Sequence, residues 1–358
     1  MKKKILISSG GSGGHVIPAT VFYDHLKEYY DVLISTDKRG DKFINKNKYK
    51  NIIFNTPNLS KNIFLLPFNL LTIFLLTIKS IIYLKKKKVN ILLTTGGYMS
   101  LPFCIASKFL NIEIFLFEPN MVIGRANKFF LNSCKKIFCY SQNIKKFPNK
   151  FLNKIVVIKP LLRKYFYSNI VKKSSSLKKD LNLLIIGGSQ GAKLFDTVLK
   201  KSIIELAKEY KLKVYHQTQM TNLKDLKNFY VNNNIDNQIF SYDENILQII
   251  SKANLCITRA GASTLSELVF LNIPFLTIPL LSSKDDHQYE NAAFYKNLGC
   301  CWILKQNNLD DNKIKNSLVN IIENEEDYLM KKNKMHEFSS QNNWNYINQK
   351  IISTLNEN

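Results

Sequence analysis

Short apolar runs of strand length alternate along this chain with longer segments of helical spacing. In the first half, strands are expected at 4–8, 31–35, 51–54, 91–95, 113–117 and 136–140. Helices are expected at 17–29, 101–109 and 123–132, the first with Pro18 in its first turn. Strands that alternate with helices indicate parallel βαβ units, and hence a doubly wound sheet.

The alternation restarts after a polar segment of low complexity at 166–182, which predicts a linker or surface loop near a domain boundary. Beyond it, strands are expected at 183–186, 212–215, 253–258 and 274–279, a helix at 193–209, and helical structure from 311 onward. A chain of 358 residues suits two domains. The pattern therefore predicts an α/β protein of two Rossmann-like domains, each with a doubly wound parallel sheet, that face a cleft.

Three glycine clusters each follow a short apolar run, at the point where a strand should turn into a helix. They lie at 9–15 (SGGSGGH), 95–98 (TGGY) and 187–192 (GGSQGA). Such a turn exposes backbone N–H groups at a helix N-terminus, which suits phosphate or diphosphate. In open α/β sheets, ligands collect at the carboxyl ends of the strands, where these loops belong. The clusters therefore predict two nucleotide-fold domains that share one substrate.

Two side chains beside these loops are candidates for chemistry. His15 ends the first cluster, where the helix dipole disfavours an imidazolium, so a neutral ring could accept a proton as a general base. The alternative is a capping histidine bonded to backbone. Glu267 lies one turn into a helix that begins after Gly261, and it could accept two hydrogen bonds from a ribose diol. Its alternative role is to offset the helix dipole.

Residues 63–84 (IFLLPFNLLTIFLLTIKSIIYL) are almost continuously apolar and precede four lysines at 85–88. Their length approaches that of a membrane span. A span would, however, place residues 1–60 and 90–358 on opposite sides of the membrane and separate the glycine loops. Two alternatives remain open at this point: a helix that rests on an anionic lipid surface through 63–88, and an ordinary core helix.

Composition adds a strong positive charge, with 51 Lys+Arg against 27 Asp+Glu and a formal net charge of +24. This favours an anionic partner, although a compositional bias toward Lys, Asn and Ile would explain part of it. Nucleic acid is not expected, since aromatic and basic residues are not interleaved in a recognition motif.

The six cysteines lack CxxC pairing, which predicts reduced, buried thiols and no zinc site. The first apolar run is too short for a signal peptide, so a cytoplasmic protein is expected.

Six segments occur in an order that resembles the MurG family of bacterial peptidoglycan glycosyltransferases: 10–15, 96–98, 118–128, 187–192, 259–267 and 285–292. The resemblance spans residues 5 to about 300. It implies a GT-B fold with an acceptor- and membrane-associating domain at 1–162 and a UDP-sugar domain at 163–340. A C-terminal helix at 341–358 would pack back on the first domain.

The same resemblance implies an inverting transfer of N-acetylglucosamine from UDP-N-acetylglucosamine to lipid I, the undecaprenyl-diphosphate-linked muramoyl-pentapeptide, to give lipid II. Neither a metal nor another cofactor is expected, and no DxD-type acidic pair stands at a strand end. The implied location is the cytoplasmic face of the inner membrane, as a peripheral protein. The cell-wall synthesis machinery is a candidate source of protein partners.

Site residues are carried over from the family motifs one by one. The expected donor contacts are Ser12, Gly13, Gly14, Asn120, Arg163, Ser189, Asp243, Ala262, Ser263, Thr264, Leu265, Ser266, Glu267 and Gln288. Among them, Glu267 would hold the ribose, Ser189 the diphosphate and the backbone around Asp243 the uracil. The expected contacts of the acceptor diphosphate are Gly13, Gly14, Gly96, Gly97 and Tyr98, with His15 as the catalytic base.

Some residues depart from the family pattern. Phe117 and Pro119 flank Glu118 where the family usually has histidine and glutamine, and Lys159-Pro160-Leu161 replaces Gly-Asn-Pro, which leaves the register of Arg163 open. A related GT-B transferase with another lipid acceptor, such as diacylglycerol, is the main rival. An NAD-dependent oxidoreductase does not fit the glycine spacing of the first loop.

Overall fold

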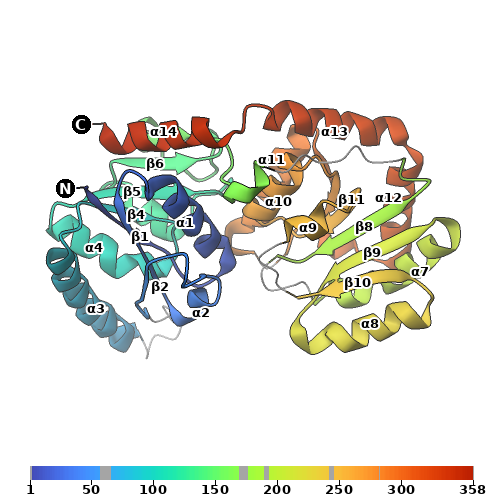
Figure 1. The fold of residues 1–358 in the computed structure, drawn as a ribbon, viewed down its shortest axis with the longest axis horizontal. Helices are drawn as coiled ribbons and strands as arrows, with labels where there is room; N and C mark the ends of the chain where they lie inside the picture. The colour runs from blue at the N-terminus through green and yellow to red at the C-terminus, as the bar shows by residue number, and fades with distance from the viewer. Residues whose placement is uncertain are drawn as a thin grey trace. The chain divides into compact units, whose positions relative to one another are not determined.

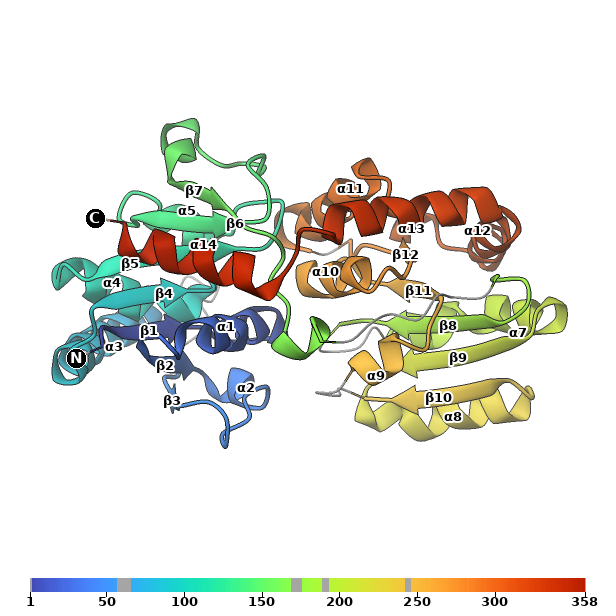
Figure 2. The same ribbon diagram turned by 45° about the horizontal axis from the view of Figure 1, so that its top comes forward.

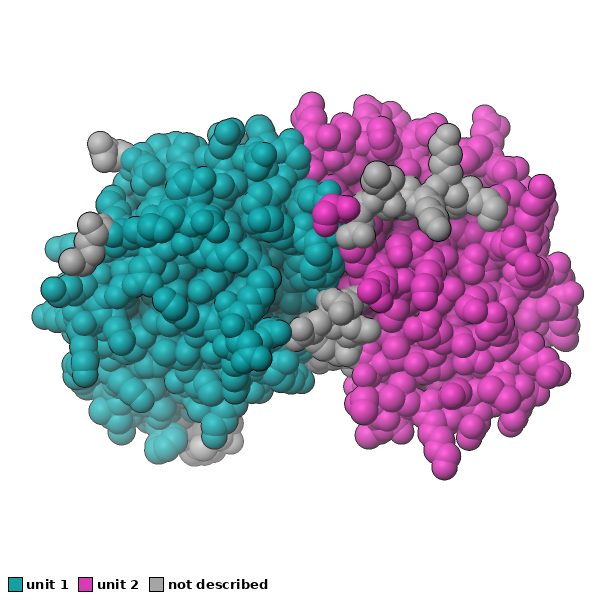
Figure 3. All heavy atoms as spheres, in the orientation of Figure 1, with its two compact units in different colours: residues 1–167, 343–358 teal, residues 168–342 magenta. Residues whose placement is uncertain are grey.

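The computed structural model describes residues 2–56, 66–168, 176–188, 193–241, 246–281 and 283–357. The chain divides into two compact units, coloured separately in Figure 3. Unit 1 comprises residues 1–167 and 343–358, and unit 2 comprises residues 168–342. The divisions therefore fall after Tyr167 and before Asn343.

Unit 1 contains a seven-stranded sheet in the order β3-β2-β1-β4-β5-β6-β7, and all of its paired strands are parallel. The strands are β1 (Lys4–Ser8), β2 (Asp31–Thr36), β3 (Asn51–Ile53), β4 (Ile91–Thr94), β5 (Glu113–Glu118), β6 (Lys136–Cys139) and β7 (Ile155–Val157). β4 is buried along its whole length, and β1 and β5 along all but their first residue. Burial on both faces explains why these strands read as continuous apolar runs.

Helices cover both faces of this sheet (Figures 1 and 2). They are α1 (Gly13–Leu26), α2 (Lys38–Asp41), α3 (Leu66–Lys87), α4 (Leu101–Phe109), α5 (Arg125–Phe130) and α14 (Trp344–Asn356), with short 3₁₀ turns η2 (Tyr98–Ser100), η3 (Asn149–Lys154) and η4 (Lys164–Phe166). Right-handed crossovers place α1 on one face and α3 with α4 on the other. α14 packs against α1, where Trp344 stacks on His25 with ring centroids 3.6 Å apart.

Unit 2 contains a six-stranded sheet in the order β10-β9-β8-β11-β12-β13, again with parallel pairs. The strands are β8 (Leu181–Ile186), β9 (Leu212–Gln217), β10 (Asp236–Phe240), β11 (Leu255–Thr258), β12 (Phe275–Thr277) and β13 (Cys301–Ile303). The helices are α6 (Phe195–Val198), α7 (Lys200–Glu209), α8 (Leu223–Asn232), α9 (Leu247–Ile250), α10 (Ala262–Phe270), α11 (His287–Asn297), α12 (Asp311–Glu323) and α13 (Glu325–Ser339). Short 3₁₀ turns are η5 (Met220–Asn222), η6 (Lys284–Asp286) and η7 (Gln306–Asn308). Leu183, Ile185 and Ile257 are fully buried in its core.

The prediction of two α/β domains with doubly wound parallel sheets is confirmed. Two local expectations were wrong. The first helix begins at Gly13 rather than at 17, so Pro18 lies inside α1 instead of in its first turn. The expected helix at 193–209 is divided into α6 and α7. The linker expected at 166–182 overlaps the end of η4 and the start of β8, and its residues 169–175 lie outside the described part of the chain.

Each sheet reverses its strand order at one point, between β1 and β4 in unit 1 and between β8 and β11 in unit 2. Ligands of open α/β sheets bind outside the carboxyl ends of the strands at such a switch point. The three glycine clusters of the sequence follow β1, β4 and β8. The loop after β11 is not one of these clusters, and it leads to Gly261 at the start of α10. The fold therefore places the predicted loops where a ligand site is expected.

α3 contains the long apolar segment for which the sequence left open a choice between a lipid-contacting helix and an ordinary core helix. By length and composition, Pro67–Lys87 could cross a membrane, but α3 connects β3 to β4, two strands of one sheet. A span is therefore excluded, because it would place these strands on opposite sides of the bilayer. α3 is not an ordinary core helix either. Polar Asn69, Thr77 and Ser80 are buried against the unit, whereas large apolar residues are exposed: Phe68, Leu70, Leu71, Phe74, Leu75, Ile78 and Ile82.

All six cysteines are buried, and none forms a disulfide. Burial raises the pKa of the Cys104, Cys256 and Cys301 thiols, so these groups stay protonated and unreactive near neutral pH. The prediction of reduced, buried thiols agrees with this arrangement.

Candidate active site

Three loops of unit 1 begin at neighbouring strand ends. Ser8 at the end of β1 is paired with Thr94 at the end of β4, and Thr94 is paired with Leu116 in β5. The first glycine cluster follows β1, the second follows β4, and the segment from Glu118 follows β5. The register of the sheet thus brings together three motifs that are far apart in the sequence.

The N-terminus of α1 offers unbonded N–H groups at this edge. Ser12 is the N-cap residue in extended conformation, and its side chain makes no capping hydrogen bond. The N–H groups of His15 and Val16 donate to the Ser12 carbonyl at 3.0 and 3.1 Å. The first N–H groups of a helix have no intrahelical partner. Those of Gly13 and Gly14 are therefore available to an anion.

His15 is held in a defined orientation. Its Nδ1 lies 2.7 Å from the carbonyl oxygen of Thr95. Because a carbonyl oxygen only accepts, Nδ1 must carry the hydrogen, and the neutral ring then has its lone pair on Nε2. Nε2 lies 3.7 Å from the position that a Cβ at Gly97 would occupy. The ring nitrogen that can accept a proton is therefore next to the second glycine loop.

The second loop needs its glycines. Gly96 and Gly97 have φ values of +87° and +81°, which side-chain-bearing residues rarely adopt. A Cβ at Gly96 would also lie only 3.3 Å from the side-chain nitrogen of Asn127. The loop can therefore approach both His15 and Asn127 closely, and larger residues would push them apart.

Glu118 is the organising residue of the third loop, and sequence reasoning assigned it no role. The carboxylate is buried, and its Oε1 accepts hydrogen bonds from the backbone and side-chain nitrogens of Asn120 at 3.2 and 2.9 Å. Its Oε2 accepts from the Gly124 N–H at 2.7 Å and from the Asn127 side chain at 2.9 Å. One carboxylate thus fixes Asn120, an expected donor contact, and Gly124, the residue that caps α5.

Several buried oxygens around these loops lack hydrogen-bond partners among the described residues. They are Ser9 Oγ, Thr95 Oγ1 and Asn127 Oδ1. Buried polar groups are normally paired, and exceptions cluster at sites that bind a ligand or water. They mark the same edge of the sheet as the glycine loops.

Unit 2 repeats this arrangement on its own sheet. The last residues of β8 and β12, Ile186 and Thr277, pair with Thr258 at the end of β11. Gly261 is the N-cap residue of α10 in extended conformation and has no side chain that could bond the first N–H groups of the helix. The N–H groups of Ala262, Ser263 and Thr264 therefore have no acceptor within the helix and are available to an anion.

Two side chains tie the loops of unit 2 together. Gln288 Oε1 accepts from the N–H groups of Leu280 and Ala260 at 3.0 and 3.3 Å, so only its amide nitrogen is left to contact a sugar. Arg259, another residue without a role in the sequence analysis, is almost fully buried. Its guanidinium donates to Ile278 O and Gln306 Oε1 at 2.8 and 2.7 Å and lies over the Phe195 ring. Burial lowers the pKa of Arg259, but the group stays charged.

The residues in the first turns of α10 differ in how far their side chains and N–H groups are already engaged within unit 2. Glu267 is buried one turn into the helix. The hydroxyl of Ser266 contacts Ala262 O at 2.8 Å and Tyr295 Oη at 3.0 Å, and the side chain of Leu265 is in the core. The Leu265 N–H donates to Gly261 O. The expected ligand contacts of Leu265 and Ser266 therefore rest on their position in the turn alone.

The remaining predicted residues lie elsewhere. Arg163 precedes η4 at the end of unit 1, with its guanidinium over the rings of Tyr165 and Phe166 at 5.1 and 5.5 Å. Ser189 and Asp243 lie outside the described residues. Tyr98 begins η2 directly after the second glycine loop.

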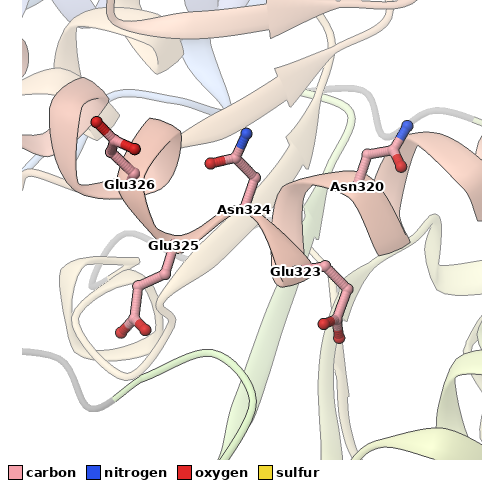
Figure 4. A pocket seen from close by; sticks show the side chains of 5 residues that line it. All are labelled: Asn320, Glu323, Asn324, Glu325 and Glu326. Carbon is pink, nitrogen blue, oxygen red and sulfur yellow. The ribbon is translucent and has the colours of Figure 1, made fainter.

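A separate hollow lies between α12 and α13 (Figure 4). It is lined by Asn320, Glu323, Asn324, Glu325 and Glu326, and Glu323 is already paired with Lys178. An acidic hollow does not suit an anionic ligand, so it is not part of the candidate site. Over the described residues, no cluster of three or more His, Cys, Asp or Glu side chains is placed to hold a metal ion.

Comparisons with known proteins identify the family. Residues 5–139 match the N-terminal domain of glycosyltransferase family 28, and residues 182–344 match its C-terminal domain. The chain is 54% identical, over 359 aligned residues and the full length of both chains, to a protein of Pelagibacter ubique (strain HTCC1062). That protein is a UDP-N-acetylglucosamine–N-acetylmuramyl-(pentapeptide) pyrophosphoryl-undecaprenol N-acetylglucosamine transferase. The chain belongs to the MurG family.

Other members support this assignment. A Rickettsia bellii protein of the same name is 35% identical over 331 residues, which cover 90% of this chain and 91% of that protein. The crystal structure of Acinetobacter baumannii MurG has a TM-score of 0.74 at 22% identity and covers 99% of this chain and 100% of its own. A UDP-GlcNAc 2-epimerase from Neisseria meningitidis has a TM-score of 0.66 at 14% identity, covering 99% and 100% of the two chains. These two structures share the fold, which is the GT-B fold expected of the MurG family.

The matched ranges include the loops of both units. His15, Gly96 and Asn120 lie within the N-terminal match, and Glu267 and Gln288 lie within the C-terminal match. Arg163 falls between the two ranges. Its role as a donor contact therefore stays a prediction with an open register.

Proposed function

We propose that this protein transfers N-acetylglucosamine from UDP-N-acetylglucosamine to lipid I and so forms lipid II. The observation that carries the proposal is the 54% identity, over full length, to the Pelagibacter ubique enzyme whose name states this activity. The two glycine-lined loop clusters give the reaction a physical basis, because both substrates carry a diphosphate.

Unit 2 would bind the donor. The N–H groups of Ala262, Ser263 and Thr264 at the N-terminus of α10 would bind the UDP diphosphate, and Ser189 is a further expected contact of that diphosphate. As the bond from C1 to the β-phosphate oxygen breaks, negative charge develops on UDP, and oriented N–H donors stabilise that charge. Glu267 would accept hydrogen bonds from the ribose, the backbone near Asp243 would contact the uracil, and the amide nitrogen of Gln288 would bind the sugar.

Unit 1 would bind the acceptor. The N–H groups of Gly13 and Gly14, with the loop from Gly96 to Tyr98, would hold its diphosphate. Nε2 of His15 would take the proton of the acceptor hydroxyl while the hydroxyl oxygen attacks C1. The Nδ1–H bond to Thr95 supports this role, because it leaves Nε2 as the accepting nitrogen.

Direct displacement by the acceptor oxygen inverts the configuration at C1. It requires one base and stabilisation of one leaving group, which are the functions assigned to His15 and to α10. Because N–H donors would supply the stabilisation, we infer that transfer does not require a metal ion.

α3 would bring the protein to the lipid substrate. Its exposed apolar side chains would rest on the acyl boundary of the cytoplasmic leaflet, and the exposed lysines at 85–88 would contact anionic headgroups. The proposal therefore includes a peripheral location on the inner membrane, where proteins of the cell-wall machinery are candidate partners.

The function is tested with labelled UDP-N-acetylglucosamine and a short-chain lipid I analogue. We expect label in the lipid fraction at the same rate with and without EDTA. Diacylglycerol is the matched alternative acceptor, and label transferred to it but not to lipid I would overturn the proposal. A rate abolished by EDTA would overturn metal independence alone.

Donor binding gives a sharper prediction at Glu267. The Glu267→Ala variant loses two charge-assisted hydrogen bonds of about 1.5–3 kcal/mol each, so its affinity for UDP-N-acetylglucosamine should fall at least about 100-fold. Glu267→Gln keeps the side-chain volume and guards against misfolding, and Glu326→Ala on α13 serves as an exposed control. Isothermal titration measures the affinities. Unchanged affinity in both Glu267 variants would refute the ribose assignment.

Membrane binding should depend on the exposed face of α3. Replacing Phe74 and Ile82, each 61% exposed, by Ser removes apolar burial of about 1.5–3 kcal/mol per side chain in the bound state. Sedimentation with anionic vesicles should therefore show at least about tenfold weaker binding, while the folded protein is unaffected. Val231→Ser on α8 is the control, since Val231 is similarly exposed. Equal loss in the control variant would contradict a specific role for α3.

A further inference from the structure

Three loop ends of unit 1 are linked by a chain of polar contacts that the proposed mechanism does not use. The chain runs from Gly11 in the first glycine loop, through Asp37 and Arg39 after β2, to Tyr98 after the second glycine loop. Neither Asp37 nor Arg39 is among the site residues expected from the sequence. Both residues belong to α2 or cap it.

Asp37 is the fixed centre of this chain. Its side chain is 6% exposed, and Oδ1 accepts from the Gly11 N–H at 3.1 Å and from the Gly40 N–H at 2.7 Å. Oδ2 accepts from Arg39 Nε at 2.8 Å and from Nη2 at 2.7 Å. Burial alone would raise the pKa of Asp37, but the hydrogen bonds from Gly40, Arg39 and Gly11 outweigh it, so its pKa is lowered. The carboxylate is therefore ionised at neutral pH and holds Gly11 in its left-handed conformation.

Arg39 connects Asp37 to Tyr98, which follows the second glycine loop. Its side chain is 49% exposed, and Nη2 lies 3.7 Å from the position of a Cβ at Gly11. The same Nη2 donates to the hydroxyl oxygen of Tyr98, and the guanidinium lies 5.6 Å from the centroid of the Tyr98 ring. A cation that served only to pair with Asp37 would not need this second contact.

The hydrogen bond from Arg39 makes the Tyr98 oxygen an acceptor and so determines the role of the Tyr98 O–H. A phenol oxygen that accepts from Arg39 has its own O–H left to donate elsewhere. Hydrogen bonds in a chain polarise one another, so acceptance from a guanidinium strengthens that O–H as a donor. An anionic oxygen is the partner such a donor suits best.

We propose that Asp37 and Arg39 are positioning residues for the acceptor: they fix the Gly11 loop and orient the Tyr98 hydroxyl to donate to a phosphate oxygen of the lipid-linked diphosphate. This inference rests on the proposed function. Arg39 acts through Tyr98, so loss of either side chain should weaken the acceptor site and leave the donor site unchanged.

The test is a double-mutant cycle in the transfer assay with Arg39→Met, Tyr98→Phe and the double variant. Each single variant should raise KM for the lipid I analogue roughly 10- to 100-fold, the loss expected for one charge-assisted hydrogen bond, with KM for UDP-N-acetylglucosamine unchanged. The double variant should lose no more than Tyr98→Phe alone, because the two residues act as one unit. Arg39→Lys, which keeps the charge without the planar fork, should recover part of the loss.

Lys38→Met is the matched control, since Lys38 is an exposed cation next to Arg39 on the same short helix. Additive losses in the double variant, or equal changes in both KM values, would overturn the inference. If the wild-type protein transfers sugar and Arg39→Met keeps the wild-type acceptor KM, the inference fails alone. If the wild-type protein transfers nothing to lipid I, the proposed function fails and this inference fails with it.

Discussion

Replacing His15 by Gln is expected to lower kcat for transfer by about 10²–10⁴-fold, the usual contribution of a positioned general base. Glutamine can still donate to the Thr95 carbonyl and hold the loop, but it cannot take a proton from the acceptor hydroxyl. KM for both substrates should therefore stay close to the wild-type values. Steady-state kinetics with the lipid I analogue measure both parameters.

The control for this variant is His336→Gln on α13, an exposed histidine distant in sequence from every glycine loop. It should leave kcat unchanged. A His15→Gln variant that keeps wild-type kcat would contradict the assignment of the base. A variant that raises KM alone would instead assign His15 to binding.

Replacing Glu118 by Leu is expected to have the largest effect on stability. Four hydrogen bonds to one buried carboxylate would be lost, and each buried donor left without a partner costs about 1–3 kcal/mol. The free energy of unfolding of unit 1 should therefore fall by at least about 3 kcal/mol. Hydrogen exchange of residues 118–130 reports this loss locally, without assuming that both units unfold together.

Glu113→Gln is the matched control, because Glu113 begins the same strand and forms a half-exposed ion pair with Lys135. An exposed pair contributes at most about 1 kcal/mol, so exchange in the 118–130 segment should hardly change. Similar acceleration in both variants would contradict the organising role of Glu118. Glu118→Gln, which keeps one acceptor oxygen, should fall between the two.

The sequence predicts the central strands of both sheets well, and the reason is burial. β1, β4 and β5 lie inside a parallel sheet covered on both faces, so nearly every position must be apolar. The glycine loops are also predictable, because a strand that turns directly into a helix leaves a short, recognisable signature. Their placement at the two switch points then follows from chain order.

Edge strands and polar hubs are harder to predict. β7, β10 and β13 lie at sheet edges. β10 (Asp236–Phe240) is mostly polar, so no apolar run in the sequence indicates a strand there. Glu118 is a hub because Asn120, Gly124 and Asn127 converge on it in space, and sequence spacing does not indicate convergence. The link from Asp37 through Arg39 to Tyr98 includes a contact between residues 59 positions apart, and only the arrangement of the strands brings them together.

α3 illustrates a third limit. Its sequence is apolar around the whole helix, so periodicity cannot say which side faces the sheet. The structure shows that small polar residues, including Ser80 and Thr77, face inward, where their hydroxyls bond to backbone carbonyls of the preceding turn. Ile73 and Leu84 are buried beside them, but most of the larger apolar side chains are exposed, and this exposed apolar face is the feature that favours a lipid contact.

The most direct test of the proposed function is to identify the product made from UDP-N-acetylglucosamine and the lipid I analogue. We expect mass spectrometry to show the acceptor heavier by one N-acetylhexosamine residue, and proton NMR to show a β linkage at the new anomeric carbon. An unchanged acceptor with the nucleotide sugar converted to its 2-epimer would contradict the account, since an epimerase from Neisseria meningitidis shares this fold. An α linkage would contradict the inverting mechanism.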